Sequence, residues 1–181
     1  DNPLQAHYNL ACSAQVLLEK ILVNMVEKNL KHINEHSICI SGGVALNCVA
    51  NSLVVEKQYP NMWILPNPGD AGSSLGCAAY VNGKHLDFME NGAFLGYNIK
   101  GDYPVKPVLK ELLKGNLVGV ANGRAEYGPR ALGNRSLLAD PRGKDIKAQM
   151  NKIKNRQEFR PFAPSVLEEH AHEIFDMPTK K

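Results

Sequence analysis

The sequence predicts an α/β protein built in two parts. Two short apolar stretches, residues 37–41 and 62–65, are each followed by a glycine-containing turn and then by a helical pattern, which is the order of elements in an α/β fold. A third stretch, residues 117–121, leads into a loop rich in arginine. Residues 1–95 carry a net charge of −3 and no arginine, whereas residues 96–181 carry +6 and all six arginines. We therefore expect two domains that meet near residue 95.

The composition is that of a globular protein rather than a membrane or disordered one. Of the 181 residues, 44% are hydrophobic and 22% are charged, which is ordinary for a soluble domain. No apolar run approaches the roughly 20 residues that span a bilayer, and no signal peptide opens the chain. We expect a cytoplasmic protein with no membrane partner. Because the chain begins with Asp1 rather than Met, we expect a C-terminal fragment of a longer protein.

The four cysteines predict free thiols. They form no CxxC pair and lie among apolar or small residues. Buried thiols in a reducing compartment are therefore favoured over disulfides or a zinc site.

The first half opens with an amphipathic pattern over residues 4–28, where apolar side chains recur at three- and four-residue spacing and predict a core-packing helix. The strand at residues 37–41 then runs into Gly42 and Gly43, and residues 44–55 continue as a helix. This order suits a nucleotide, because no Cβ blocks its approach and a helix N-terminus offers free N–H groups. Many α/β turns also need glycine for backbone reasons alone, so both interpretations stay open.

Two asparagines of this helix share one face. Asn47 and Asn51 are four residues apart. They could hydrogen-bond a ribose or a base, or they could cap the helix and face solvent.

The second strand, residues 62–65, ends in a turn at residues 66–72, and residues 73–81 follow as a helix of small residues. Asp70 falls where a helix N-cap belongs, a role that contributes about 1 kcal/mol and needs no ligand. The alternative is a carboxylate at the carboxyl edge of a strand that ligates a phosphate-bound metal.

The second half alternates helices, strands and cationic loops. Residues 82–96 predict a linker or hairpin. The other expected elements are helix 105–113, strand 117–121, strand 136–139, helix 144–152 started by Asp145, a strand after residue 164 and helix 168–175.

Two loops of this half concentrate cations. The arginine loop, residues 123–136, and the second cationic loop, residues 154–164, follow a strand and a helix respectively. Guanidinium groups on glycine-bearing loops suit a planar oxyanion such as phosphate, carboxylate or carbamate. Glu126 either orients an arginine or is an ordinary surface acid. Arg135 and Tyr127 either contact the anion or brace the loop.

Four motifs in order resemble the O-carbamoyltransferase family, the nodulation (NodU-type) and antibiotic carbamoyltransferases. They are residues 41–47 (SGGVALN), 68–72 (PGDAG), 123–136 (GRAEYGPRALGNRS) and 159–164 (FRPFAP). The arginine loop is the most specific of them, and the resemblance covers nearly the whole chain.

For residues 1–95, the resemblance implies the second lobe of an actin/hexokinase-type ATPase-like domain, related to the tRNA threonylcarbamoyl-transfer protein. It implies nucleotide-binding roles for Gly42, Gly43 and Asn47. It also implies that Asp70 joins two histidines on a divalent metal, iron or magnesium. Those histidines belong to the first lobe, and no HxxxH occurs in this sequence.

For residues 96–181, the resemblance implies a truncated YrdC-like α/β domain that forms carbamoyl adenylate from carbamoyl phosphate and ATP. The carbamoyl group then passes to a hydroxyl of a small acceptor, a sugar or natural product. The expected catalytic anion contacts are Arg124, Arg130, Arg156, Arg160 and Lys154, and Arg135 and Tyr127 are expected at the cofactor. We expect this fragment alone to be inactive, and a homodimer stays open.

Two other functions remain in view. The basic half could belong to a tRNA-modification or RNA-binding module, although only Tyr127, Phe159 and Phe162 supply aromatic rings among the arginines. The chain could also be a scaffold that folds without catalysing a reaction.

Overall fold

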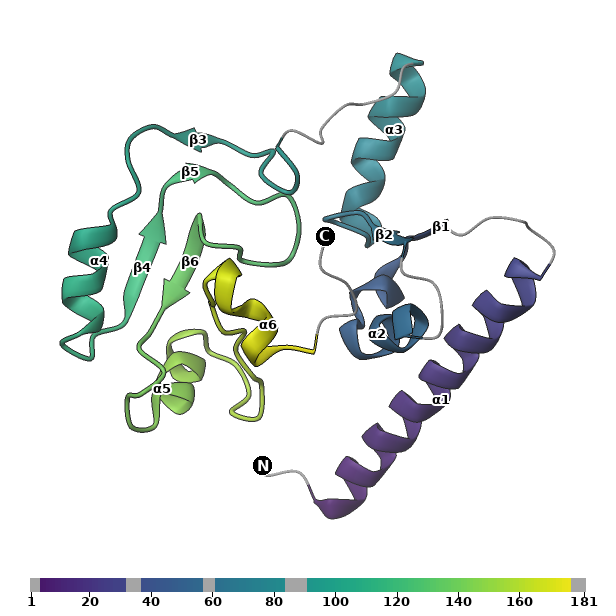
Figure 1. Cartoon of the computed structure of the whole chain (residues 1–181), viewed down its shortest axis with the longest axis horizontal. Helices are drawn as coiled ribbons and strands as arrows, with labels where there is room; N and C mark the ends of the chain where they lie inside the picture. The colour runs from purple at the N-terminus through teal and green to yellow at the C-terminus, as the bar shows by residue number, and fades with distance from the viewer. Residues whose placement is uncertain (1–3, 32–36, 57–60, 84–90, 177–181) are drawn as a thin grey trace. The chain divides into compact units, whose positions relative to one another are not determined.

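The structure is a computed structural model that describes residues 4–31, 37–56, 61–83 and 91–176. These residues form a mixed α/β protein with two-stranded sheets (Figure 1), which confirms the α/β class. The chain divides into two compact units, the first made of residues 1–84 with 172–181 and the second of residues 85–171. The domain bounds expected from the sequence, 1–95 and 96–181, stay a prediction.

The first unit is built on a parallel strand pair with a helical crossover. β1 (Ser37–Ile40) pairs with β2 (Asn61–Ile64), with Ser37 opposite Asn61 and Ile40 opposite Ile64. Parallel strands need a long connection, and here it consists of η1 (Gly43–Leu46) and α2 (Cys48–Glu56). The helix expected over residues 44–55 is therefore interrupted, because Asn47 leaves helical geometry at φ −81° and ψ 90°.

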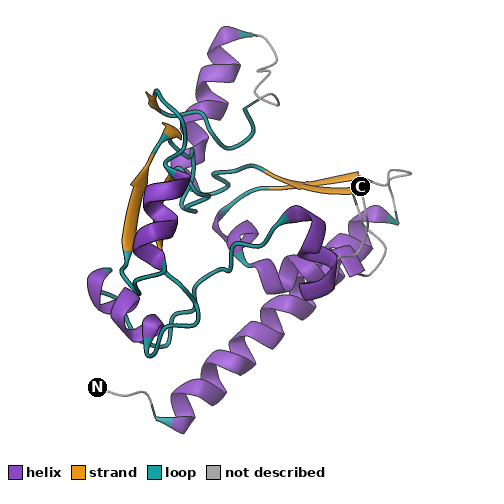
Figure 2. Ribbon diagram, turned by 60° about the vertical axis from the view of Figure 1, so that its left-hand side comes forward, coloured by secondary structure: helices purple, strands orange, loops and turns teal. Residues whose placement is uncertain are grey.

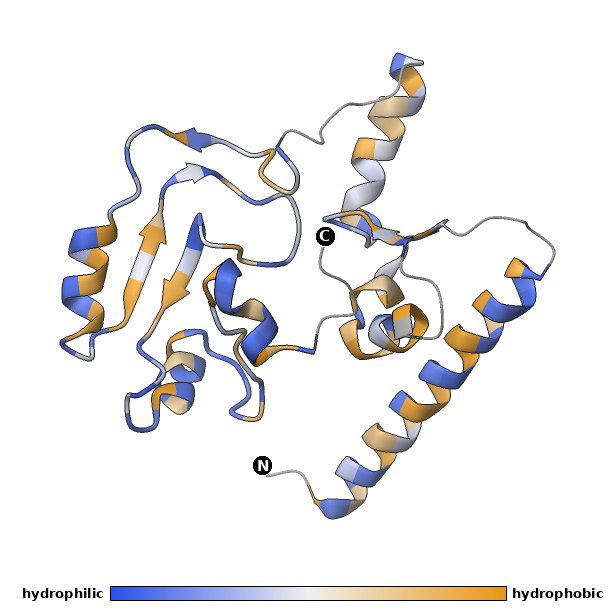
Figure 3. Cartoon of the chain, viewed as in Figure 1, coloured by the Kyte–Doolittle hydropathy of each residue, from blue (hydrophilic) through white to orange (hydrophobic). Residues whose placement is uncertain are grey.

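A long first helix supplies half of the core of this unit. α1 (Gln5–Leu30) packs on α2 through its last turns. The buried cluster consists of Leu22, Val23 and Val26 from α1 with Ala50 and Val54 from α2. Earlier turns of α1 leave apolar side chains exposed. Figure 3 shows apolar residues in orange along the length of this helix.

α1 is the one described helix of membrane-spanning length and composition. Its 26 residues are long and apolar enough, by length and composition, to cross a membrane. The core helix of a soluble protein passes the same test, so this property assigns α1 no location.

The remainder of the first unit follows β2. A short 3₁₀ turn, η2 (Asp70–Gly72), leads directly into α3 (Ser73–Asn82). α3 ends at Gly83, which adopts φ 63°, the left-handed geometry that glycine accepts without strain.

The second unit contains two antiparallel strand pairs, drawn as orange arrows in Figure 2 with the other strands. β3 (Asn98–Ile99) pairs with β5 (Gly123–Arg124), and β4 (Val118–Ala121) pairs with β6 (Arg135–Leu138). The helices of this unit are α4 (Val105–Leu112), α5 (Ile146–Ile153) and the 3₁₀ turn η3 (Glu168–His170). The single turn α6 (Ala171–Ile174) follows η3, and its last three residues are assigned to the first unit. Among the described residues of this unit, the buried apolar side chains are those of Val108, Val120 and Met150.

One expected feature of the second half is wrong, because the residues after Pro164 form no strand before η3 begins at Glu168. The expected start of the following helix is confirmed, since Asp145 is the N-cap of α5, although it adopts φ 53° and its side chain makes no capping hydrogen bond. Most of the hairpin or linker expected at residues 82–96 lies outside the described residues, since 84–90 are not described.

The expectation of buried thiols is also wrong. Cys12, Cys39, Cys48 and Cys77 are all free and exposed. The helices of this small unit bury at most one face, and α3 buries no residue at all. An apolar neighbourhood in the sequence therefore did not mean burial.

A substitution at Gly72 tests how tightly the turn after β2 is packed. A Cβ at this buried residue would lie 1.7 Å from the backbone oxygen of Asn67. We expect Gly72→Ala to lower the free energy of unfolding by about 2 kcal/mol or more, measured by urea denaturation.

Gly76→Ala is the matched control, since the space beside Gly76 in α3 is open. It is expected to raise stability by about 0.5–1 kcal/mol, because alanine favours a helix interior. Equal effects of the two substitutions would contradict the close approach at Gly72.

Candidate functional site

The parallel pair β1–β2 places two motif turns side by side. Both turns leave the carboxyl ends of their strands, where ligands bind in open α/β sheets. The Gly42 N–H donates to the Pro68 carbonyl at 2.7 Å, and the Ser41 hydroxyl reaches the same oxygen at 3.3 Å. Gly42 adopts φ 100°, a backbone geometry that side chains other than glycine rarely allow.

The first turn offers fewer donors than the sequence suggests. Open space surrounds the Cβ positions of Gly42 and Gly43, which leaves room for a ligand. The Gly42 N–H is already bound to Pro68. Gly43 and Val44 are the first residues of η1, and the first N–H groups of such a helix have no acceptor within it. These two N–H groups are therefore the donors that the turn can offer to a ligand.

Asn47 is a helix cap held by a partner that sequence reasoning missed. Its Oδ1 accepts the Ala50 N–H at 3.1 Å, as an N-cap does. Its amide also pairs with that of Gln15 from α1, at 2.8 Å and 3.2 Å. Asn47 therefore caps α2 but faces Gln15 rather than solvent.

Asn51 is buried and only half satisfied. It is 7% exposed, and its Nδ2 donates to the Ala45 carbonyl at 2.8 Å. Its Oδ1 has no hydrogen-bond partner. The amide ties η1 to α2 and so serves the shape of the turn.

Asp70 stands alone. It is exposed and begins η2, whose N-cap is Gly69, and α3 begins after Gly72 without a side-chain cap. The N-cap interpretation therefore does not apply. Among the described residues, no three His, Cys, Asp or Glu side chains lie close enough to hold a metal. These residues do not form a metal site by themselves.

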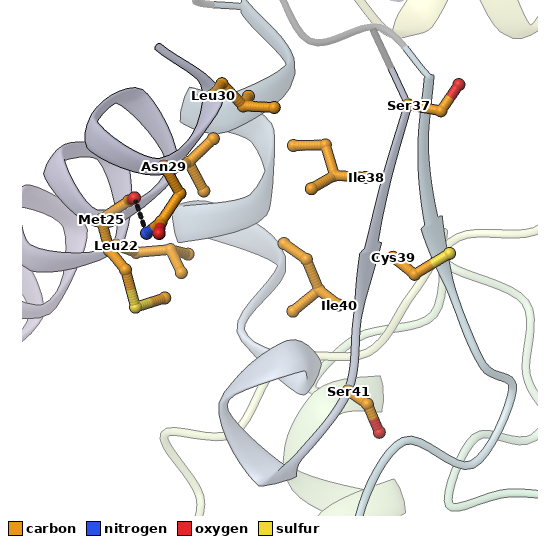
Figure 4. Close-up of a pocket in the computed structure, with 10 residues that line it drawn as sticks. Leu22, Met25, Asn29, Leu30, Ser37, Ile38, Cys39, Ile40 and Ser41 are labelled. Carbon is orange, nitrogen blue, oxygen red and sulfur yellow. Dashed lines mark hydrogen bonds between the residues drawn. The ribbon is translucent and has the colours of Figure 1, made fainter. Parts of the chain in front are cut away.

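A hollow in the first unit lies between α1 and β1 and has a volume of about 420 Å³. Figure 4 shows Leu22 and Leu30 of α1 directed toward Ile38 and Ile40, whereas Cys39 lies on the opposite face of the strand. None of the described residues that line this hollow is charged. It is an apolar seam between helix and strand and contains none of the predicted ligand residues.

In the second unit, Arg135 braces the arginine loop from within. Its Nη1 donates to the carbonyls of Asn122 at 2.9 Å and Asn134 at 2.8 Å, and its Nη2 donates to that of Tyr97 at 3.1 Å. The structure thus supports the bracing interpretation of Arg135, because carbonyl oxygens already occupy both terminal nitrogens.

Glu126 closes the other side of the same loop. One carboxylate oxygen accepts the N–H groups of Leu132 at 2.8 Å, Asn134 at 2.9 Å and Arg135 at 3.2 Å. Burial would raise the pKa of Glu126, but these donors and its own N–H outweigh burial and lower the pKa. Neither role foreseen for Glu126 is correct, because it binds backbone rather than an arginine side chain.

The remaining arginine-loop candidates lie on the outside. Arg124 and Arg130 are exposed, and the Arg124 guanidinium makes no hydrogen bond to a described residue. Tyr127 is half-buried, and its N–H donates to the Ala93 carbonyl at 2.6 Å. Asn134 donates to the Arg124 carbonyl at 2.8 Å, which fixes the backbone that carries this free cation.

The second cationic loop is ordered around Arg156. The Arg156 Nε donates to the Asn151 side chain at 2.6 Å, and Nη2 donates to the Pro161 carbonyl at 3.1 Å. Its guanidinium carbon lies 4.2 Å from the centre of the Phe162 ring, a cation–π contact. Arg160 is exposed and donates to Gln157 at 2.9 Å.

One cavity of the second unit brings the two loops together. It has a volume of about 460 Å³ and lies between the arginine loop, β6 and the end of the second cationic loop. Lys154 is the predicted catalytic residue that lines it, and the four predicted catalytic arginines do not. The lining residues are 131–133, 136–138, Lys154 and 162–166.

Sequence reasoning singled out neither Ser165 nor Asn151. Ser165 lines the cavity, and Asn151 holds Arg156. A serine in a loop or an asparagine in a helix is too common to single out. Only the return of the chain toward α5 gives Asn151 its partners.

Two family models match the chain. The model described as Carbamoyltransferase N-terminus matches residues 2–79, and the one described as Carbamoyltransferase C-terminus matches residues 109–181. The chain belongs to the carbamoyltransferase family. Both turns of the first unit fall in the first match, and both cationic loops fall in the second.

Named relatives agree with this membership. Nodulation protein NolO of Bradyrhizobium diazoefficiens is 33% identical over 96% of this chain and 36% of its own length. Nodulation protein U of Sinorhizobium fredii is 32% identical over 94% of the chain and 34% of its own length. A Synechocystis sp. protein described as uncharacterized is 37% identical over 98% of the chain and 34% of its own length. The chain thus spans about a third of the length of the curated relatives it matches.

Glu126 predicts a pH dependence for this carbamoyltransferase chain. Its folded-state pKa lies below the ordinary value of 4.5, so its stabilisation is present above pH 4.5 and is lost as the pH falls through the lowered pKa. We expect Glu126→Gln to lower the free energy of unfolding by about 1 kcal/mol at neutral pH. Urea denaturation at a series of pH values should show this gap closing on acidification.

Glu169→Gln is the control, since it also removes one negative charge from the second unit but at an exposed position. A gap between wild type and Glu126→Gln that stays constant with pH would contradict the assignment.

Proposed function

We propose that this chain forms part of an ATP-dependent O-carbamoyltransferase. The observation that carries the proposal is the shared cavity of the second unit, to which both cationic loops contribute lining residues. Membership of the carbamoyltransferase family supports a carbamoyl donor and an acceptor substrate in general. In this proposal, carbamoyl phosphate, water and ATP give carbamoyl adenylate with release of inorganic phosphate and pyrophosphate. The carbamoyl group then passes to a hydroxyl of a sugar or natural product with release of AMP.

The finer fold assignment belongs to the same proposal. The first unit would correspond to the second lobe of an actin/hexokinase-type ATPase-like domain. Its parallel β1–β2 pair and paired strand-end turns are compatible with such a lobe. The second unit would correspond to part of a YrdC-like domain.

Carbamoyl phosphate suits the cations of the second unit. It is a compact dianion with a planar head that donates and accepts hydrogen bonds, so guanidinium groups can bind it with two parallel bonds. In the proposal, Arg124 and Arg130 bring exposed positive charge from the arginine loop, and Arg160 brings it from the second cationic loop. Lys154 adds an ammonium group at the cavity wall.

These residues would act chiefly by binding and orientation. Fixed cations neutralise negative charge that grows on the leaving phosphate, and they do so without having to reorganise. Arg135 and Glu126 support this role because they hold the loop backbone in one shape before a ligand arrives.

Fewer residues of the first unit are available to contact a nucleotide than the family resemblance implies. Gly42 and Gly43 leave open space for a ligand, and in the proposal they approach ATP through their backbone. The Asn47 side chain already caps α2 and pairs with Gln15, so its contribution would be to shape the turn. Because Asp70 has no companion ligands among the described residues, no step of the proposal passes through a metal.

The RNA-binding alternative is not carried further. The family matches give it no support, and no observation in the second unit favours it over anion binding.

Carbamoyl phosphate binding tests the site assignment. In isothermal titration, Arg124→Ala and Arg130→Ala should each weaken affinity by about tenfold or more, since a charge-assisted hydrogen bond is worth about 1.5–3 kcal/mol. The titration should use the complete reading frame that encodes this chain.

Arg142→Ala is the matched control, because the Arg142 guanidinium is paired with Asp140 at 2.6 Å in a separate turn. Its affinity should equal that of wild type. Unchanged affinity in both arginine-loop variants would refute the site, and the absence of carbamoyl transfer by the complete protein would refute the function.

A further inference from the structure

Asn151 has the environment of a residue that positions another. It lies in the last part of α5 and is 0% exposed. A buried amide is costly unless its donors and acceptor are bonded, so an apolar side chain would be the simpler choice for packing alone. The partners of this amide therefore indicate what it does.

Every hydrogen-bonding group of the Asn151 side chain serves the second cationic loop. Its Nδ2 donates to the carbonyls of Glu158 and Arg160, each at 3.1 Å, and its Oδ1 accepts from the Arg156 Nε at 2.6 Å. The Arg156 N–H also donates to the Asn151 carbonyl at 3.1 Å. The Asn151 side chain thus holds the loop against α5 and forms a hydrogen bond with Arg156 in the loop.

Arg156 is restrained by further contacts. Nε is held by Asn151, Nη2 by the Pro161 carbonyl, and the guanidinium lies over the Phe162 ring. Nη1 makes no hydrogen bond to a described residue and keeps its donors for a ligand. Phe162 also lines the cavity shared by the two loops, so the restrained cation is tied to that wall.

We propose that Asn151 is a positioning residue that holds the Arg156 guanidinium in place before an anion binds at the second cationic loop. Arginine has many rotamers, and immobilising such a side chain on binding opposes association. Because Asn151 and Phe162 restrain Arg156 in advance, less of that ordering remains for the ligand. The inference rests on the proposed function for the identity of the anion, but the restraint itself needs no ligand.

The first test measures the restraint directly by NMR. In the full wild-type chain, the Arg156 Nε–H should exchange with water about tenfold or more slowly than the Arg124 Nε–H, because one is hydrogen-bonded and the other is free. Asn151→Leu, similar in size but without the amide, should bring the two rates together. Asn151→Ser does the same with a smaller side chain and serves if the leucine variant fails to fold.

Gln149→Leu is the control, since it removes an amide from the same helix that donates only to the Lys144 carbonyl. It should leave Arg156 exchange unchanged. Unaltered Arg156 exchange in a folded Asn151 variant would overturn the inference.

The second test asks whether Asn151 acts through Arg156. In isothermal titration with carbamoyl phosphate, Asn151→Ser should weaken binding about 3- to 10-fold, as expected for one side chain that must be ordered on binding. In an Arg156→Ala background, the same substitution should have no further effect. An equal loss in both backgrounds would show that Asn151 only shapes the loop and would overturn the proposal.

The two tests separate this inference from the proposed function. If the wild-type protein binds no carbamoyl phosphate, the proposed function fails, and the exchange rates still decide whether Asn151 restrains Arg156.

Discussion

The arginine loop can present the Arg124 guanidinium to solvent because two other charged residues of the loop hold its backbone. Arg135 satisfies carbonyl groups on one side of the loop, and Glu126 satisfies N–H groups on the other. Irregular backbone has few hydrogen-bond partners within the chain. Without these two side chains, the N–H and carbonyl groups of the loop would bind water, and the loop would not keep one conformation. Because Arg135 and Glu126 bind the backbone, the Arg124 guanidinium can face outward.

The second cationic loop follows the same principle with a neutral group. There, the buried Asn151 amide satisfies two carbonyls and orients Arg156. Charge for a ligand and support for the backbone therefore come from different residues of one loop. A substitution in a supporting residue would change affinity indirectly, whereas one in an outward cation would remove a contact.

Sequence patterns located most elements to within one or two residues. β1 was expected at residues 37–41 and lies at Ser37–Ile40, and β6 was expected at 136–139 and lies at Arg135–Leu138. Local apolar patterns suffice there, because each strand is short and bounded by turn residues. The strand expected after residue 164 was wrong, because only three residues separate Pro164 from the 3₁₀ turn η3, which begins at Glu168.

Individual site residues were harder to predict than elements. The sequence identified Asn47 as a ligand or cap, but its pairing with Gln15 depends on α1 crossing α2. Arg135 could have been an anion contact or a brace, and only the course of residues 97–134 around it shows a brace. Exposure of the four cysteines depended in the same way on how few layers cover the first unit.

The sequence by itself determined the α/β class, the concentration of arginine after residue 96 and the motifs that indicate the carbamoyltransferase family. These properties are local, since they depend on residue order, charge and spacing. Only the tertiary structure decided which cations are free and which are occupied by backbone. The physical reason is that a guanidinium binds whichever oxygen lies nearest, and that neighbour is set by the return of the chain rather than by the motif.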